Sequence, residues 1–502
     1  MGIRNRQQYL DSLRDDREIH IDGERVKDVT RDPRLSGGAQ AIGDLYALQC
    51  EPELQDSLSF SLEPGGERFA MSFLEPASVA DLQRRGVALK RTADATFGMM
   101  GRSPDFMNVG ITALASASEV FDHSADGRFF AANVRRHYER ARHLDLAATH
   151  VQVNPQVDRS KPVHQQAIDI ALKVVKETDA GFFVKGARQV ATLAQFANDI
   201  LVMPSVVVNS EPEAADYALA FALPIATQGL KFVSRPSTIP QNAAHFLDHP
   251  LSLRFEEGDA VVIFDDVFVP WENTFVYRDA AMCNALYQRT FLGDHYTHQS
   301  MLRAQAKSEF MIGLGCYLAK RTHVDVFPNV QTTLAPLLID LETHKGLVEL
   351  AVLKAAPTPF GTVAPNRLLL HSAQLFFFER FQKMVEAVRT IAGSGLVGAA
   401  SYAEFAGEAA QYMTTYFQSE GMDAEYRVRL LRLAADATMS AFSSRQLVYE
   451  RYYQGDPVRR AAMFYKNYPK EPLYQIIEDA LEDMRHRAEK FAPDGPGGPD
   501  QA

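Results

Sequence analysis

The spacing of hydrophobic residues changes twice along this chain of 502 residues, and that order limits the fold more than any other feature. Residues 1–150 have mainly helical spacing, and one helix is expected to begin at Ser78, which with Asp81 resembles a capping box. Residues 151–280 instead contain short β-rich runs separated by Pro, Gly, Asn and Asp. Helical spacing returns over residues 281–490. The order predicts an N-terminal helical domain, a central β-domain and a C-terminal helical bundle.

The C-terminal bundle is predicted from four long stretches of helical periodicity. These stretches are 299–322, 335–355, 366–392 and 425–452. The last residues, 491–502, are rich in Pro and Gly and lack apolar anchors, so this tail is expected to be flexible. Because the chain is longer than one hydrophobic core usually allows, we expect two or three packed regions.

Charge and cysteine usage exclude several classes of protein. The 52 basic and 63 acidic residues give a formal net charge of −11, and no long Lys/Arg block occurs, which argues against nucleic acid or an anionic membrane as a partner. Neither a signal peptide nor an apolar run long enough to span a membrane is evident. The three cysteines, Cys50, Cys283 and Cys316, form no CxxC pair or disulfide ladder. We therefore expect a soluble cytoplasmic protein.

Two familiar motifs have a simpler interpretation. Residues 393–398 match GxGxxG, but the segment before them is helical, whereas a dinucleotide site requires a strand there. We interpret this match as a helix terminus and expect no NAD(P)H site. Fourteen histidines occur without HExxH, and His295 and His298 at i, i+3 provide only two ligands, so no metal is expected. No GxSxG motif indicates a serine hydrolase.

Two polar segments stand out as candidate sites. Arg102, in the sequence GRSPDF, places a permanent positive charge in a turn that follows a helix. His150 places a titratable imidazole at the entrance to the β-domain. From the residues alone, Arg102 also fits a salt bridge at a helix end, and His150 also fits a hydrogen-bonded core residue. Both alternatives stay open at this level.

The segments GRSPDF, HVQVNPQVDR, ETDAGFFVKGARQVAT and FDDVFVPWENTFVYRD, in this order, resemble the oxygenase components of the 4-hydroxyphenylacetate 3-monooxygenase family. The resemblance implies an acyl-CoA-dehydrogenase-like fold: a helical domain, a central β-barrel and a four-helix bundle that assembles homotetramers. It also implies that a separate NAD(P)H-dependent flavin reductase supplies FADH₂ by diffusion. With O₂, such enzymes form a flavin C4a-hydroperoxide and hydroxylate phenols ortho to the hydroxyl or displace a ring substituent.

The resemblance also implies roles for individual residues. Arg102 and His150 match the catalytic groups that hold the phenol oxygen beside the flavin, where an imidazole can accept the phenolic proton and a guanidinium can stabilise the oxyanion. Further substrate-binding candidates are Phe106, Ser205, His295, His298 and Phe442. Candidates for FAD binding are His150, Gln156, Val157, Asp158, Arg159, Thr192, Gln454 and Gly455.

One residue departs from the pattern of the 4-hydroxyphenylacetate enzymes. Phe106 stands where they carry a Tyr whose hydroxyl reaches the substrate oxygen. The form with Phe resembles relatives that act on chlorinated or nitrated phenols and on tyrosine-like intermediates. The identity of the phenol, and whether it is free or tethered to a carrier protein, therefore stays open.

Two other classes of function are alternatives for this sequence. An acyl-CoA dehydrogenase or hydroxyacyl-CoA dehydratase would share the fold, but the dehydratase needs three Cys and one His for an iron–sulfur cluster, and the three cysteines here are scattered. The other class is a non-catalytic flavin-binding helical scaffold. The presence of both Arg102 and His150 in matching segments argues against that class.

Overall fold

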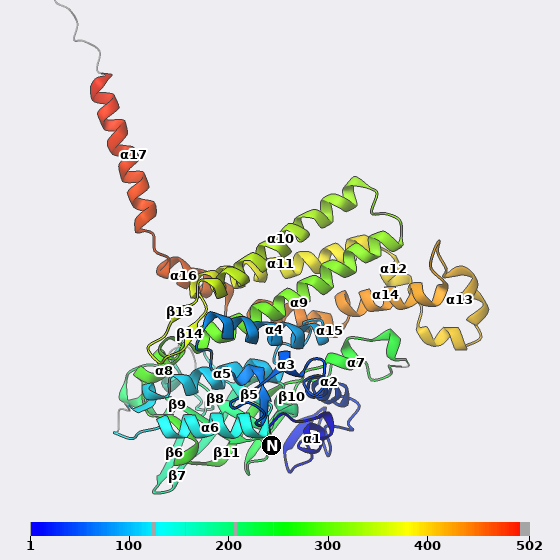
Figure 1. Cartoon of the computed structure of the whole chain (residues 1–502). Helices are drawn as coiled ribbons and strands as arrows, with labels where there is room; N and C mark the ends of the chain where they lie inside the picture. Colours follow the sequence, from blue (N-terminus) through cyan, green and yellow to red (C-terminus); the bar gives the residue numbers. More distant parts are fainter. Residues whose placement is uncertain (1, 123–126, 156, 205–207, 244, 492–502) are drawn as a thin grey trace, which may run out of the picture. The chain divides into compact units, whose positions relative to one another are not determined.

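The computed structural model describes residues 2–122, 127–155, 157–204, 208–243 and 245–491 (Figure 1). The chain divides into two compact units, Met1–Tyr453 and Gln454–Ala502. The second unit contains helices α16 (Pro457–Asn467) and α17 (Glu471–Lys490). The expected domain boundaries near residues 150, 280 and 490 remain predictions, and the tail after Phe491 lies outside the described residues.

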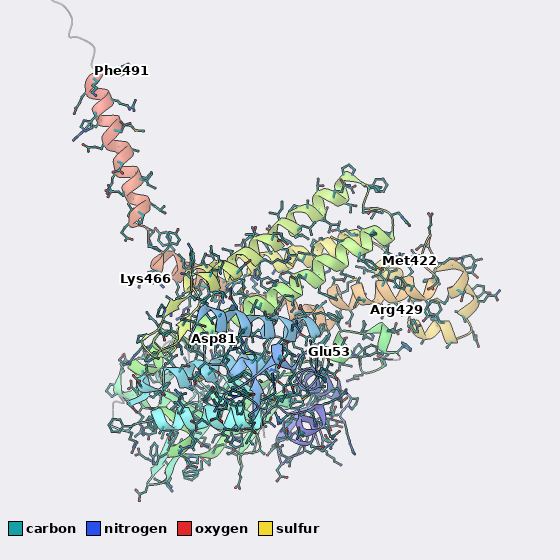
Figure 2. All side chains as sticks on the ribbon, in the orientation of Figure 1. Glu53, Asp81, Met422, Arg429, Lys466 and Phe491 are labelled. Carbon is teal, nitrogen blue, oxygen red and sulfur yellow. The ribbon has the colours of Figure 1, made fainter. Side chains whose placement is uncertain are left out.

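The N-terminal part of the first unit is mainly helical, as predicted, with four short strands. Its elements are α1 (Arg6–Asp11), β1 (Glu18–Ile21), β2 (Glu24–Arg25), α2 (Ser36–Leu48), α3 (Gln55–Leu58), β3 (Ser59–Ser61), β4 (Arg68–Ala70), α4 (Val79–Ala95), α5 (Pro104–Ser116) and α6 (Ala131–Leu144). The predicted start of α4 is confirmed, because the Ser78 side chain accepts a hydrogen bond from the Asp81 amide. Figure 2 shows the described side chains in the same view, with Asp81 labelled in the first turn of this helix.

The central β-domain consists of two sheets. The strands are β5 (Ala148–Val151), β6 (Lys173–Thr178), β7 (Gly181–Thr192), β8 (Asp199–Val202), β9 (Leu219–Pro224), β10 (Leu230–Ser234), β11 (Asp259–Pro270) and β12 (Thr274–Tyr277), and a short helix α7 (Ser252–Phe255) precedes β11. One sheet has the order β2-β1-β10-β11-β7-β6, so the N-terminal strands complete it, and the other has the order β12-β9-β8-β5.

The two sheets do not close into the expected barrel. They pack through aromatic rings, with Phe221 of one sheet 6.1 Å from Phe182 and 6.2 Å from Phe264 of the other. In the described part of the chain, an isolated bridge between Val153 and Gln189 extends β5 toward β7. All four residues of β5 pair with β8, and within the described residues no ladder joins β5 to β7. The β-domain is therefore confirmed, with an open rather than closed barrel.

The C-terminal part of the first unit is a helical bundle. Its elements are α8 (Ala280–Arg289), α9 (Leu292–Arg321), α10 (Pro328–Leu353), β13 (Ala356–Pro357), β14 (Val363–Ala364), α11 (Arg367–Ala392), α12 (Gly395–Gly398), α13 (Ala410–Tyr416), α14 (Ala424–Thr438) and α15 (Ala441–Tyr452). Figure 1 shows the long helices α9, α10 and α11 side by side, and each contacts the other two. No helix of the described residues combines the length and the apolar character needed to cross a membrane.

Two details of the bundle bear on the sequence predictions. The stretch 425–452 is not one helix, because α14 ends at Thr438 and the side chain of Ser440 caps the start of α15 by accepting from the Ser443 amide. The GxGxxG match follows α11, and its first residue, Gly393, has φ +54°. A helix rather than a strand precedes the match, as the sequence indicated, but Gly395–Gly398 form the short helix α12 instead of a loop.

Candidate active site

Arg102 lies in the turn just before α5 and carries an uncompensated charge. Its backbone amide donates to the Glu257 carboxylate at 2.9 Å, and its Nη2 donates to the Tyr453 carbonyl at 3.1 Å. Its Nη1 is buried without a hydrogen-bond partner. Within the described residues, no carboxylate forms an ion pair with the guanidinium. The alternative of a helix-end salt bridge therefore does not describe this side chain, and the positive charge is available to a ligand.

His150 lies on β5, at the edge of the Phe106 ring. The two ring centroids are 5.6 Å apart in an edge-on arrangement, and the Gln152 amide lies 3.4 Å from His150 Nε2. His150 Nδ1 is buried and has no hydrogen-bond partner. Burial lowers the pKa of His150 well below its usual value, and the charge of Arg102 lowers it further. The imidazole is therefore neutral at pH 7 and can accept a proton.

Phe106 connects these two groups. Its ring lies 4.1 Å below the Arg102 guanidinium carbon on one face. On the other face it stacks on Tyr296 of α9, with centroids 4.2 Å apart and an interplanar angle of 7°. Tyr296 is not among the residues predicted from the sequence. The only local signal was its position between His295 and His298, and its contact with α5 depends on tertiary packing.

A third orphaned polar atom belongs to the same cluster. The Tyr449 hydroxyl is buried without a partner, and the Tyr449 ring lies 5.8 Å from the Arg102 guanidinium carbon. The Tyr453 ring lies 5.1 Å from that carbon and stacks on Tyr449. An unsatisfied buried polar group costs about 1–3 kcal/mol. Arg102, His150 and Tyr449 together therefore fit an aromatic ligand with polar substituents, which describes both a phenol and a flavin ring.

A buried network of paired charges lies next to this cluster, with the Arg303 guanidinium carbon 5.1 Å from the Tyr453 ring. Arg303 of α9 donates to both oxygens of Glu450 at 2.6 and 2.7 Å, and Lys307 also bonds Glu450. Burial opposes ionisation of Glu450, but the two cations outweigh it and lower its pKa to about 2. Burial lowers the pKa of Lys307 to about 8, although Glu450 partly offsets this effect. This network joins α9 to α15, which carries Tyr449.

His295 and His298 lie elsewhere on α9. Arg85 Nη2 lies 2.6 Å from His295 Nδ1, and His298 lies beside Gly86, so both rings face α4. Burial is the main cause that lowers both pKa values, that of His298 to about 3. Because successive helical residues are rotated by about 100°, His298 and Tyr296 project from nearly opposite sides of the helix. The structure therefore does not bring either histidine to Arg102 and His150.

The other candidate residues are spread over several segments. Phe442 is a buried core residue of α15. Thr192 ends β7 and donates its hydroxyl to Asp259 at 2.6 Å. The amides of Val157 and Asp158 both donate to the Gln166 side chain, at 3.1 and 2.7 Å, and Arg159 is exposed. Gln156 and Ser205 lie outside the described residues.

The last two candidates for flavin binding belong to the second unit. The Gln454 carbonyl accepts a hydrogen bond from Arg460 Nε at 2.7 Å. Gly455 has φ +108°, a conformation that favours glycine. The flavin-binding roles of these two residues, and of Thr192 and Val157–Arg159, remain predictions.

Comparison with known proteins identifies the family. Residues 5–276 match the family model described as 4-hydroxyphenylacetate 3-hydroxylase N terminal, and residues 283–482 match the model of its C terminal. The 4-hydroxyphenylacetate 3-monooxygenase oxygenase component of Thermus thermophilus is 38% identical over 462 residues, 92% of this chain and 93% of the relative. The 4-nitrophenol 2-monooxygenase oxygenase component of Rhodococcus sp is 32% identical over 456 residues, with 89% and 85% covered.

Solved structures extend this likeness to the whole fold. The crystal structure of the oxygenase component of 4-hydroxyphenylacetate 3-monooxygenase with FAD and 4-hydroxyphenylacetate has a TM-score of 0.91 and 36% identity, and the match covers 96% of this chain and 99% of that chain. An archaeal 4-hydroxybutyryl-CoA dehydratase shares the fold, with a TM-score of 0.82 at 18% identity, covering 100% of this chain and 98% of that chain. The chain thus belongs to the 4-hydroxyphenylacetate 3-hydroxylase family.

Proposed function

We propose that this protein is the oxygenase component of a two-component monooxygenase that hydroxylates a phenol with FADH₂ and O₂. The observation that carries the proposal is the pairing of an uncompensated cation, Arg102, with a neutral imidazole, His150, on two sides of Phe106. In the overall reaction, one oxygen atom of O₂ enters the ring ortho to the hydroxyl. The other oxygen leaves as water while FADH₂ becomes FAD.

His150 and Arg102 make the ring more reactive. The neutral imidazole accepts the phenolic proton, and the guanidinium stabilises the negative charge that remains on the oxygen. Loss of this proton makes the ring electron-rich and speeds its attack on an electrophilic oxygen. When bound, reduced FAD supplies that oxygen together with O₂. The orphaned Arg102 Nη1, His150 Nδ1 and Tyr449 hydroxyl fit the polar edges of such a ligand pair.

Phe106 narrows the proposed substrate class. It offers no hydroxyl, so only Arg102 and His150 of this cluster are assigned to the substrate oxygen. Because the GRSPDF segment resembles relatives that act on substituted phenols, we propose phenols with ring substituents as substrates. Hydroxylation and displacement of a substituent are distinguished by product analysis with 4-nitrophenol and a chlorophenol.

Partners and assembly are also part of the proposal. We propose that a separate NAD(P)H-dependent reductase delivers FADH₂ by diffusion, and that Thr192 and Val157–Arg159 help to hold the flavin. Exposed apolar residues on α17 support a homotetramer, because such a face is usually covered by another chain. These residues are Leu473, Ile476, Ile477, Leu481 and Met484. A cytoplasmic location is supported by three cysteines that are all free.

Purified protein tests the function directly. With NADPH, FAD, O₂ and a phenol, we expect hydroxylated product only when a flavin reductase is added. Steady turnover with NADPH in the absence of a reductase would contradict the proposal. The same preparation, measured by light scattering at micromolar concentration, should have the mass of a tetramer.

A further inference from the structure

We propose that Tyr296 is a positioning residue that fixes the Arg102 guanidinium through the ring of Phe106. The inference rests on the proposed function, because it concerns how the cation reaches the phenolic oxygen. In this proposal the aromatic ring of Tyr296, and not its hydroxyl, is the group that orients Arg102 for hydroxylation.

The three side chains form a layered stack. Phe106 is the middle layer, with Tyr296 stacked on one face at 4.2 Å and the Arg102 guanidinium carbon 4.1 Å from its centroid. The His150 ring lies in an edge-on arrangement with the Phe106 ring, with the two centroids 5.6 Å apart. Rotation of Phe106 would break the aromatic stack and the cation–π contact at once. The orientation of Tyr296 is thereby transmitted to Arg102.

Arg102 depends on this stack because it has few other restraints. Its side chain makes one hydrogen bond, from Nη2 to the Tyr453 carbonyl, and forms no ion pair within the described residues. A carboxylate partner would hold the guanidinium more firmly but would also compensate its charge. Neutral aromatic faces hold a cation without compensating it. The stack thus explains how Arg102 stays oriented and still carries its full charge for a phenolate.

Tyr296 is itself held firmly. Its hydroxyl donates to Met107 Sδ at 3.5 Å, and its ring fills the space beside Gly110, where an added Cβ would lie 2.3 Å from the ring. Burial raises the pKa of Tyr296 well above 10, so the hydroxyl stays protonated. Within the described residues, the hydroxyl makes its hydrogen bond to Met107 of α5 and makes none to Arg102 or His150. This geometry assigns a positioning role to the ring.

The test uses a phenol whose ionisation is visible. 4-Nitrophenol bound to the protein with oxidised FAD reports the local stabilisation of the phenolate, since its absorbance gives its apparent pKa. We expect Tyr296→Leu to raise this pKa by about one unit and to lower coupled hydroxylation about 10-fold, the effect of losing one aromatic pair. Tyr296→Phe keeps the ring and should match the wild-type protein in both measurements. If Tyr296→Phe shifted the pKa as much as Tyr296→Leu, the assignment to the ring would be wrong.

Three further variants make the outcome decisive. Leu302→Ala removes volume from the side of α9 that faces Gly86, and should change thermal stability without changing the pKa of bound 4-nitrophenol. Phe106→Leu removes the middle layer of the stack and should raise the pKa of bound 4-nitrophenol as much as Tyr296→Leu does. This variant therefore tests the proposal even if Tyr296→Leu does not fold. Arg102→Gln should raise the pKa most. If Arg102→Gln raises the pKa of bound 4-nitrophenol while Tyr296→Leu and Phe106→Leu leave it unchanged, the positioning role of Tyr296 is wrong. If Arg102→Gln also leaves this pKa unchanged, the proposed function is wrong.

Discussion

Two buried arginines in this protein have opposite surroundings. Arg303 donates to both oxygens of Glu450, and Lys307 bonds the same carboxylate. Arg102 is in contact with aromatic rings and a backbone carbonyl, and its Nη1 has no partner. The first arrangement satisfies its charges internally and ties α9 to α15. The second leaves a charge unsatisfied at the place where a substrate is proposed to bind, so the difference separates a structural cation from a functional one.

The largest effect is expected at His150, the neutral partner of the unsatisfied cation. His150→Ala should reduce hydroxylation about 10²- to 10⁴-fold, the usual contribution of a positioned base, while FAD binding changes little. Product and H₂O₂ should be measured together in single turnovers, because flavin oxidation should then yield mainly peroxide. Wild-type coupling in this variant would show that His150 is only a core residue.

The pH dependence offers an independent check on His150. Because burial and Arg102 hold its pKa well below 6.5, the imidazole remains neutral as the pH falls through 6.5, so the acid limb of kcat/KM should lie below that pH. An acid limb centred at 6.5 or above would contradict the assignment of a buried neutral base.

Mutation of the ion network of Arg303, Lys307 and Glu450 should change the stability of the fold. Glu450→Gln leaves Arg303 and Lys307 buried without their counterion, and should lower the free energy of unfolding by about 3–5 kcal/mol. Thermal and urea unfolding at fixed protein concentration measure this loss. Replacing all three residues together with apolar residues of similar size should recover much of it. An unchanged melting temperature in Glu450→Gln would mean that this network does not stabilise the fold.

Some features of the fold and of the candidate site could be predicted from the sequence alone. The turn at Arg102 was predicted from its local segment, and the Ser78 cap and the helix before Gly393 were confirmed. His150 was predicted only to lie at the entrance to the β-domain, whereas the structure places it within β5. The break between α14 and α15 was missed because helical spacing continues across it, although Ser440 is a good capping residue.

Tertiary contacts account for the other differences. Tyr296 could not be predicted, because its role depends on the approach of α5 to α9 at Gly110. His295 and His298 were candidates because the family resemblance implies an active-site histidine in this region, but the helix turns them toward α4. Which face of a helix meets a site is decided by packing between segments far apart in the chain, and local periodicity does not reveal it.

Arg102→Met should show the reverse of the Glu450 result. Removing an unpaired buried cation costs no ion pair, so the melting temperature should stay the same or rise. Hydroxylation should nevertheless fall about 10²- to 10³-fold, and binding of the phenol should weaken, because the oxyanion loses its cation. The melting temperature and the single-turnover product yield should both be measured on the same preparation of Arg102→Met and compared with the wild-type protein. A large loss of stability in Arg102→Met would place Arg102 with Arg303 among the structural cations.

Phe106→Tyr should give the smallest effect and sharpen the comparison most. Tyrosine keeps the aromatic ring, so the stack between Tyr296 and Arg102 should persist, and the electrostatic environment of the phenol should change little. The new hydroxyl adds a donor that the resemblance implies for the 4-hydroxyphenylacetate enzymes. Small para-substituted phenols should therefore react within about threefold of the wild-type rate or faster, and any gain should not exceed the free energy of one hydrogen bond. Product yields for 4-hydroxyphenylacetate and 4-nitrophenol, measured side by side in both proteins, test this. A loss as large as that of Arg102→Met would mean that the ring is too tightly enclosed to accept an oxygen, and that Phe106 serves the cation alone.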